Sequence, residues 1–220
     1  DGGSAILMSH LGRPLKKKKE DGSINVEKFT LNHVTDHVAK LLKTKVHFCP
    51  ETVGAQATKM AKALPAGEIL ILENTRFQAE EGKGDEGFAK KLAALADVYV
   101  NDAFGTAHRA HASTTTVAQF FKKGEKSFGF LMQNEIENAN KVLNNPDRPL
   151  TAIIGGAKVS DKILLLEKLL EFANNVIVGG GMAYTFMKAQ GGRVGNSLVE
   201  DDRLALALKL IEKAKERGVK

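Results

Sequence analysis

The sequence predicts an α/β fold in which parallel strands alternate with amphipathic helices. Short apolar runs end at glycine or polar residues, which is typical of buried parallel strands, and segments with a helical period lie between them. The composition is 43% hydrophobic and 26% charged over 220 residues. These values indicate a globular protein with room for one large domain or two small ones.

The predicted elements follow one another along the chain. Strands are expected at Ser4–Ser9, Glu68–Leu72, Asp97–Val100, Thr151–Ile154 and Asn175–Val178. Helices are expected over Leu31–Leu42, Glu86–Leu95, Ser160–Phe172 and Asp201–Arg217. The first helix would place four apolar residues on one face, namely Val34, Val38, Leu41 and Leu42. The third would begin with Ser160 as its N-cap.

Two segments resemble boundaries. Asn144–Pro149 is rich in asparagine and proline and ends the helix expected over Met132–Leu143, so we interpret it as a link between two α/β units. Lys16–Lys19 begins a charged loop. This lysine run could bind an anion or nucleic acid, or it could be a solvated insertion. The absence of interleaved aromatic residues favours the solvated insertion.

Charge and cysteine content narrow the classes of partner and compartment. Lysine and arginine number 32 against 26 acidic residues, and the resulting net charge of +6 indicates an anionic partner. Nucleic acid, acidic lipid and phosphorylated metabolites all satisfy that condition. The sequence has no apolar run of about 18 residues, so we expect no membrane span. Cys49 has no second cysteine to pair with, which is typical of a reducing compartment.

Basic side chains follow the ends of the first three predicted strands. The carboxyl ends of parallel strands share one edge of a sheet, where ligands bind. We therefore expect a basic cluster there, made of His10, Arg13, Arg76, His108 and Arg109. Guanidinium groups match phosphate and carboxylate oxygens in pairs. Any single arginine could be a surface ion-pair partner, but three at equivalent strand ends favour an anion site.

Glycine-rich turns follow the last two predicted strands. Gly155–Lys162 reads GGAKVSDK and Gly179–Ala183 reads GGGMA, and each precedes a helix. Glycines let the backbone approach a ligand, and helix N-terminal amides bind anions. The two turns suit a flat adenine and ribose, although each could equally be a tight turn. Lys158 and Lys162 are four residues apart, so both side chains can lean toward the same turn. The P-loop spacing is absent.

Other candidate sites are weaker. His33 and His37 are four residues apart, but no further ligand that would complete a metal site with them is evident. His108 and His111 flank Arg109, whose charge disfavours a cation. We therefore predict no metal site. The run Ser113–Thr116 lacks a nucleophile-elbow context and is interpreted as the N-cap of a helix through Phe121.

The chain resembles the phosphoglycerate kinase family in a series of long segments. They occur in the family's order as SHLGRP (Ser9–Pro14), ENTRF (Glu73–Phe77), NDAFGTAHRAHAS (Asn101–Ser113), GGAKVSDKI (Gly155–Ile163) and GGGMAYTF (Gly179–Phe186). The resemblance implies two Rossmann-like, three-layer α/β domains with parallel sheets, joined by a hinge helix. A 3-phosphoglycerate-binding domain would cover 1–130, the hinge 131–148, and the start of an incomplete nucleotide-binding domain 149–220.

The same resemblance implies a reaction and its residues. Family members transfer a phosphoryl group between 1,3-bisphosphoglycerate and ADP, giving 3-phosphoglycerate and ATP in glycolysis and gluconeogenesis. Arg13, Lys158 and Lys162 would be catalytic. Substrate would contact His10, Leu11, Gly12, Arg13, Arg76, His108 and Arg109. Nucleotide would contact Gly156, Ala157, Lys158, Lys162, Gly179 and Gly180. Mg²⁺ would arrive with ADP or ATP, and its protein ligand is expected outside this chain.

Two family motifs, RVDFN and GGGDS, are absent, and family members are nearly twice as long. We therefore expect an internal fragment that binds 3-phosphoglycerate but is inactive alone. The resemblance also implies a cytoplasmic monomer without a nucleic-acid or membrane partner. A competing hypothesis is a polyanion-binding module built on Lys16–Lys19, for which oligonucleotide binding would fall steeply with salt.

Overall fold

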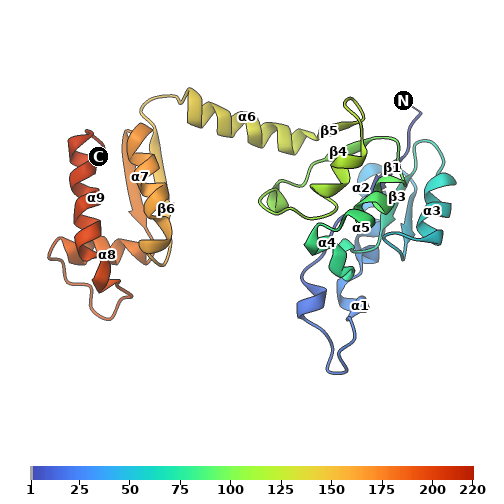
Figure 1. Ribbon diagram of the computed structural model, residues 1–220, viewed down its shortest axis with the longest axis horizontal. Coiled ribbons are helices and arrows are strands. Elements are labelled where there is room, and N and C mark those ends of the chain that lie inside the picture. The colour runs from blue at the N-terminus through green and yellow to red at the C-terminus, as the bar shows by residue number, and fades with distance from the viewer. Residues whose placement is uncertain (1) are drawn as a thin grey trace. The chain divides into compact units, whose positions relative to one another are not determined.

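The computed structural model describes residues 2–220, and its elements are shown in Figure 1. The chain divides into two compact units, the first ending at Glu137 and the second running from Asn138 to Lys220. Helix α6 (Phe130–Asn144) crosses this boundary and contains the predicted Met132–Leu143 helix. No helix among the described residues is long and apolar enough to cross a bilayer.

Parallel strands form the sheets of the first unit. β1 (Ala5–Leu7), β3 (Ile69–Leu72) and β2 (Val46–Cys49) lie in the order β1–β3–β2. β4 (Tyr99–Asn101) pairs instead with β5 (Lys126–Phe128), also in parallel. The three predicted strands of this unit are confirmed, whereas β2 and β5 were not predicted. β4 belongs to a separate sheet, so the first three predicted strands do not share one sheet edge.

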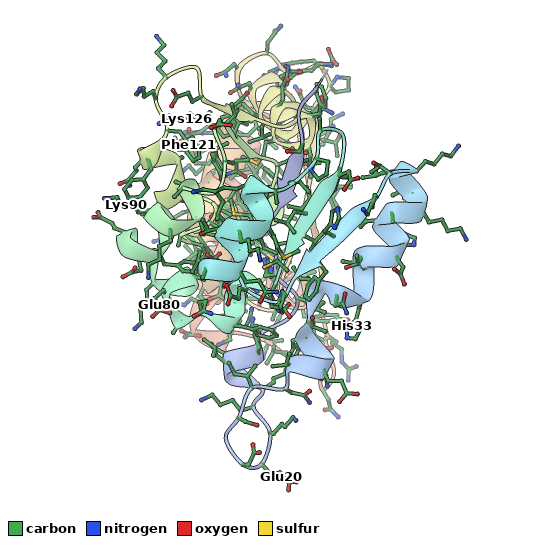
Figure 2. All side chains as sticks on the ribbon, turned by 90° about the vertical axis from the view of Figure 1, so that its right-hand side faces the viewer. Glu20, His33, Glu80, Lys90, Phe121 and Lys126 are labelled. Atoms are coloured by element: carbon green, nitrogen blue, oxygen red, sulfur yellow. The ribbon has the colours of Figure 1, made fainter. Side chains whose placement is uncertain are left out.

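The first unit has three layers because both faces of β3 are covered. Successive side chains of a strand point to opposite faces. Leu70 and Leu72 pack in a core with Ala57 of α3 (Ala55–Lys62) and with Phe88 of α5 (Glu86–Ala93). On the other face Ile69 and Ile71 pack with Leu31 and with Val38 of α2 (Thr35–Leu42). Figure 2 shows His33, just before α2, and Lys90, in α5, on opposite sides of the strands.

The helix expected over Leu31–Leu42 is interrupted. Leu31–Val34 is a 3-10 turn, and α2 begins at Thr35. A 3-10 turn has about three residues per turn, so it shifts the phase of the face that a continuous α-helix would present. The predicted apolar face was therefore wrong in part. Val38 packs on the core, but Leu41 and Leu42 are 69% and 52% exposed.

The remaining elements of this unit are short. Two are the α-helices α1 (Val26–Phe29) and α4 (Ala79–Lys83). The others are 3-10 turns at Pro14–Lys16, Thr75–Phe77, Phe104–Thr106 and Thr116–Phe120. The last replaces the helix expected after Ser113, and it has no side-chain cap. The Ser113–Thr116 capping prediction was wrong because Ser113 and Thr116 donate to Glu81 and to the Gly84 carbonyl instead.

The second unit packs its helices on one face of a parallel strand pair. β6 (Thr151–Gly155) pairs with β7 (Asn175–Gly179). Ile154 and Val178 pack with α7 (Ile163–Phe172), α8 (Met182–Ala189) and α9 (Leu204–Glu216). On the other face Ile153 and Ile177 lie opposite each other and are 76% and 53% exposed. Both predicted strands of this unit are confirmed.

Each predicted helix of this unit begins with a 3-10 turn. These turns are Ser160–Lys162 before α7 and Asp201–Arg203 before α9. Ser160 was expected to cap α7, but Lys162 occupies the N-cap position and no side chain caps the helix. The serine hydroxyl donates to Glu200, which lies 40 residues further along the chain. A tertiary partner thus replaces the predicted local one.

Candidate functional site

Buried polar residues at the end of β3 attach the loop that follows β1. Asn74 is fully buried, and its side-chain amide donates to the carbonyls of Leu11 at 2.9 Å and Phe29 at 2.8 Å. The backbone amide of Thr75 donates to the Ser9 carbonyl at 3.0 Å. The end of β3 is therefore bonded directly to the loop that carries His10 and Arg13, two residues of the predicted basic cluster.

Glu73 makes a second connection from the same position. It is 6% exposed, and its carboxylate accepts hydrogen bonds from the Leu31 amide at 2.9 Å and the Thr30 hydroxyl at 2.7 Å. A carboxylate that accepts several donors at a buried position fixes the backbone strongly. The acidic and amide residues of ENTRF are therefore structural supports, a role that the sequence analysis did not assign.

Arg76 lies against the loop that carries Arg13. Its Nη1 donates to the carbonyl of Gly12 at 3.0 Å. Gly12 has φ +62°, and a Cβ there would lie 2.8 Å from Cε1 of Phe29. The close approach therefore requires glycine at this position. Leu11 is 40% exposed, and it contributes to this packing through its backbone carbonyl, which accepts the hydrogen bond from Asn74.

The basic side chains predicted from different strand ends lie close enough to affect one another. Burial lowers the pKa of Arg76, and the charges of Arg109 and Arg13 lower it further. Burial also lowers the pKa of His10, with further lowering by the charges of Arg76, His111 and Arg109. His10 is therefore neutral at pH 7, and the arginines supply the fixed positive charge of the cluster.

His108 and Arg109 lie in the segment after β4. Both are exposed, and Arg109 Nε donates to His108 Nε2 at 3.1 Å. The segment contributes a further histidine that the sequence analysis did not include in the cluster. His111 is 8% exposed, and its charge contributes to the lowered pKa of His10.

Glu81 attaches this segment to α4. Its carboxylate accepts the Ser113 amide at 3.0 Å and the Ser113 hydroxyl at 2.6 Å, and His111 Nδ1 lies 3.8 Å from Oε1. Glu81 is 1% exposed. The sequence analysis missed it because nothing in a run of two adjacent glutamates on a charged helix distinguishes the buried one.

The two glycine-rich turns of the second unit are in direct contact. The amide of Met182 donates to the Gly156 carbonyl at 2.8 Å. Gly180 has φ +67°, and a Cβ there would lie 3.0 Å from the backbone N and O of Gly156. Gly179 lies opposite Gly155 in the strand register. The absence of side chains thus lets the two turns form one continuous backbone surface.

Two lysines border that surface. Lys162 is half-buried, and its Cε lies 3.6 Å from the position that a Cβ on Gly156 would take. Lys158 is exposed, as is Ala157 beside it. The backbone amides of the next two residues, Val159 and Ser160, both donate to the carboxylate of Glu200. This turn therefore presents lysine side chains, while an internal carboxylate occupies two of its amides.

The lysine run Lys16–Lys19 begins in the Pro14–Lys16 turn of the first unit and continues into an exposed loop that leads to α1. The Lys19 amide donates to the Ser23 carbonyl at 2.9 Å, and Figure 2 shows Glu20 at the tip of the loop, away from the strands. Within residues 2–220 no three histidine, cysteine or acidic side chains are grouped closely enough to hold a metal ion.

The family model for phosphoglycerate kinase matches residues 1–220. The chain belongs to the phosphoglycerate kinase family. It is 52% identical to the phosphoglycerate kinase of Anaeromyxobacter sp. (strain Fw109-5), over 97% of this chain and 52% of the relative. It is also 52% identical to that of Moorella thermoacetica, over 100% of this chain and 53% of the relative.

Solved phosphoglycerate kinases share its fold. The structure from Coxiella burnetii matches 98% of this chain and 52% of its own with a TM-score of 0.78 and 38% identity. That from Pyrococcus horikoshii matches 97% of this chain and 51% of its own with a TM-score of 0.70 and 30% identity. The α/β class with parallel sheets is therefore confirmed. The chain spans about half the length of the curated relatives it matches.

Proposed function

We propose that the protein acts as a phosphoglycerate kinase, with the first unit binding 3-phosphoglycerate and the second binding ADP or ATP. The observation that carries this proposal is the grouping of Arg76 and Arg109 near His10, with Arg13 near Arg76. So much positive charge in one place favours a small ligand with more than one negative charge. 3-Phosphoglycerate has a phosphate at one end and a carboxylate at the other.

In the substrate site the arginines would bind the two anionic groups. Arg76 is partly oriented by its bond to the Gly12 carbonyl, which leaves the rest of its guanidinium to ligand. His10 and His108 would contribute hydrogen bonds, and Leu11 and Gly12 would shape the loop beneath. An anion here would favour the protonated form of His10 and raise its lowered pKa.

In the nucleotide site the backbone would form the flat surface for adenosine. Gly156, Ala157, Gly179 and Gly180 supply it, and the Gly156–Gly180 contact leaves no room for a side chain between the turns. Lys158 and Lys162 would bind the phosphates as point charges.

The chemistry needs little covalent help from the protein. A β-phosphate oxygen of ADP attacks the acyl phosphate, the bond from phosphorus to the carboxyl oxygen breaks, and the carboxylate of 3-phosphoglycerate leaves. The attacking oxygen is already ionised and the leaving group departs as a stable carboxylate, so neither a general base nor a general acid is required. Arg13, Lys158 and Lys162 would act by neutralising the charge on the transferring group. Transfer needs the reacting atoms within about 3–3.5 Å, so the two units must bring their ligands together during turnover.

Mg²⁺ would enter with the nucleotide and offset the charge of its phosphates. Residues 2–220 contain no group of three or more histidine, cysteine or acidic side chains that could hold the ion. The proposal also includes a monomer acting in the cytoplasm. The free, buried thiol of Cys49 is compatible with a reducing compartment.

Calorimetric titration tests the substrate site. We expect 3-phosphoglycerate to bind the 220-residue chain and Arg76→Ala to lower its affinity by about tenfold or more, since a charge-assisted bond contributes about 1.5–3 kcal/mol. Arg148→Ala is the matched control, because it removes the same charge where the arginine donates to the Phe172 carbonyl. Unchanged affinity in Arg76→Ala would show that the cluster is not the substrate site.

Turnover tests the role of Lys158. In a coupled assay of ATP formation, with the protein expressed at its full natural length, Lys158→Ala should lower kcat far more than it raises the KM for 1,3-bisphosphoglycerate. Wild-type turnover in that variant would contradict the proposal.

A further inference from the structure

We propose that Glu200 is a positioning residue that holds Lys158 in place for nucleotide phosphates. This inference rests on the proposed function, because it takes Lys158 to contact the nucleotide. The carboxylate of Glu200 has the same sign of charge as the nucleotide phosphates and would not bind them itself. Its effect would therefore pass through the turn that carries the lysine.

The carboxylate of Glu200 binds the residues that directly follow Lys158. Its Oε2 accepts the amide of Val159 at 2.5 Å and that of Ser160 at 3.2 Å, and its Oε1 accepts the Ser160 hydroxyl at 2.6 Å. Val159 is fully buried. One side chain from a distant segment therefore fixes the backbone at the base of the lysine, which otherwise lies in an exposed turn.

Glu200 is in turn attached to the other glycine-rich turn. Its backbone amide donates at 3.2 Å to the hydroxyl of Thr185, which is 1% exposed and lies in α8. α8 begins at Met182, whose amide donates to the Gly156 carbonyl. Hydrogen bonds at Glu200 and at Met182, together with the first turn of α8 between them, thus link both turns and fix the lysine turn relative to the proposed adenosine surface.

Charge explains why this arrangement suits a lysine that binds phosphate. Hydrogen bonds from Ser160 keep the pKa of Glu200 below its ordinary value, so the side chain is an anion at neutral pH. That anion takes the two amides that could otherwise have bound a phosphate. The phosphate contact of the turn then depends on the side chain of Lys158, whose position depends on the backbone that Glu200 holds.

The first unit contains the same arrangement beside its own arginine. Glu81 accepts both the amide and the hydroxyl of Ser113, at 3.0 Å and 2.6 Å, and Ser113 follows Arg109 in the same segment. A glutamate from a distant element thus holds a serine close to a predicted anion-binding cation in each unit. The recurrence is a second, independent observation in favour of a positioning role.

A double-mutant cycle on the protein at its full natural length tests the inference, with MgADP affinity measured by calorimetry. We expect Lys158→Ala to weaken binding about tenfold or more and Glu200→Gln about fivefold. In the Lys158→Ala background, Glu200→Gln should change affinity by less than about twofold, because the residue acts through the lysine. Glu200→Asp, which keeps the charge, should restore part of the affinity.

Matched variants separate positioning from loss of fold. Ser160→Ala removes one of the three hydrogen bonds and should weaken binding about threefold even if Glu200→Gln fails to fold. Glu167→Gln, at an ion pair with Lys213 in the same unit, should leave affinity unchanged. The inference would be overturned if Glu200→Gln weakened binding equally with and without Lys158. It would also be overturned if neither Glu200→Gln nor Ser160→Ala changed the affinity. If Lys158→Ala alone has no effect, the proposed nucleotide site is wrong as well.

Discussion

Glu81 and Ser113, which are 32 residues apart in the sequence, share two hydrogen bonds. The serine amide and hydroxyl both donate to the carboxylate, whose side chain is only 2% exposed. The pair joins α4 to the segment that carries His108 and Arg109. The position of the basic cluster therefore depends on an acidic side chain that no ligand would touch.

Glu81→Gln should destabilise the first unit. The amide keeps the size of the side chain but cannot accept both donors as a carboxylate does, and one buried donor is left without its partner. We expect a loss of about 2–3 kcal/mol in the free energy of unfolding, measured by urea denaturation. Glu80→Gln, at the adjacent exposed position, is the control and should change this value by less than about 0.5 kcal/mol.

Gly180→Ala should destabilise the second unit through both backbone conformation and crowding. Gly191→Ala provides the comparison. Gly191 has φ +83°, and no atom would lie within 4 Å of a Cβ placed on it, whereas a Cβ on Gly180 would lie 3.0 Å from backbone atoms of Gly156. The Gly191 variant should lose about 1 kcal/mol for its φ angle, and the Gly180 variant about 1–3 kcal/mol more. Equal losses in urea denaturation would show that the two turns are not in close contact.

Unfolding of the first unit should depend on pH through His10 and His111. The pKa of each is lowered in the folded state, chiefly by burial. Below the ordinary histidine value of 6.5 the unfolded chain therefore binds more protons than the folded one. Stability contributed by these groups is present above that value and is lost as the pH falls below it.

The measurement for this prediction is the free energy of unfolding at about pH 7.5 and about pH 5.5, for the wild type and for His10→Gln. The variant should lose less stability on acidification than the wild type, because it lacks one group that resists protonation. An identical pH dependence would contradict the prediction. Added 3-phosphoglycerate should reduce the wild-type loss, since an anion stabilises protonated His10.

Leu70→Ala should be among the most destabilising core substitutions. Leu70 is fully buried in β3, in the core with Cys49, Ala57 and Phe88. Truncation should cost about 2–5 kcal/mol because the surrounding side chains fill the cavity only in part. Leu41→Ala, at a site 69% exposed, should cost less than about 1 kcal/mol by the same urea measurement.

The prediction of strands and helices from local pattern had clear limits. Ile69–Leu72 is apolar throughout and is buried on both faces, so its pattern identified it directly. Val46–Cys49 contains His47, which bonds to Glu68 on the neighbouring segment, and a histidine in so short a run hid the strand. Lys126–Phe128 is exposed throughout, and Phe128 is its one apolar residue, so it lacks the apolar run that marks a buried strand.

The same limits apply to the capping residues and the candidate site. Ser160 and Ser113 were interpreted as local caps because serine commonly serves its own helix, but each donates to a glutamate far along the chain. Glu81 and Glu200 look like ordinary surface acids in the sequence. Pattern alone cannot identify them, because their function depends on donors that folding brings to them.

Periodicity, composition and motif order are local properties of the chain, and they were enough to predict the α/β class, the glycine-rich turns and the basic residues after the strands. The tertiary structure decided that β4 leaves the main sheet, that both faces of β3 are covered, and that His10 is held among arginines. It also decided which glutamates are buried supports. These features depend on hydrogen bonds and charges between residues far apart in sequence, and such distances exist only after the chain has folded.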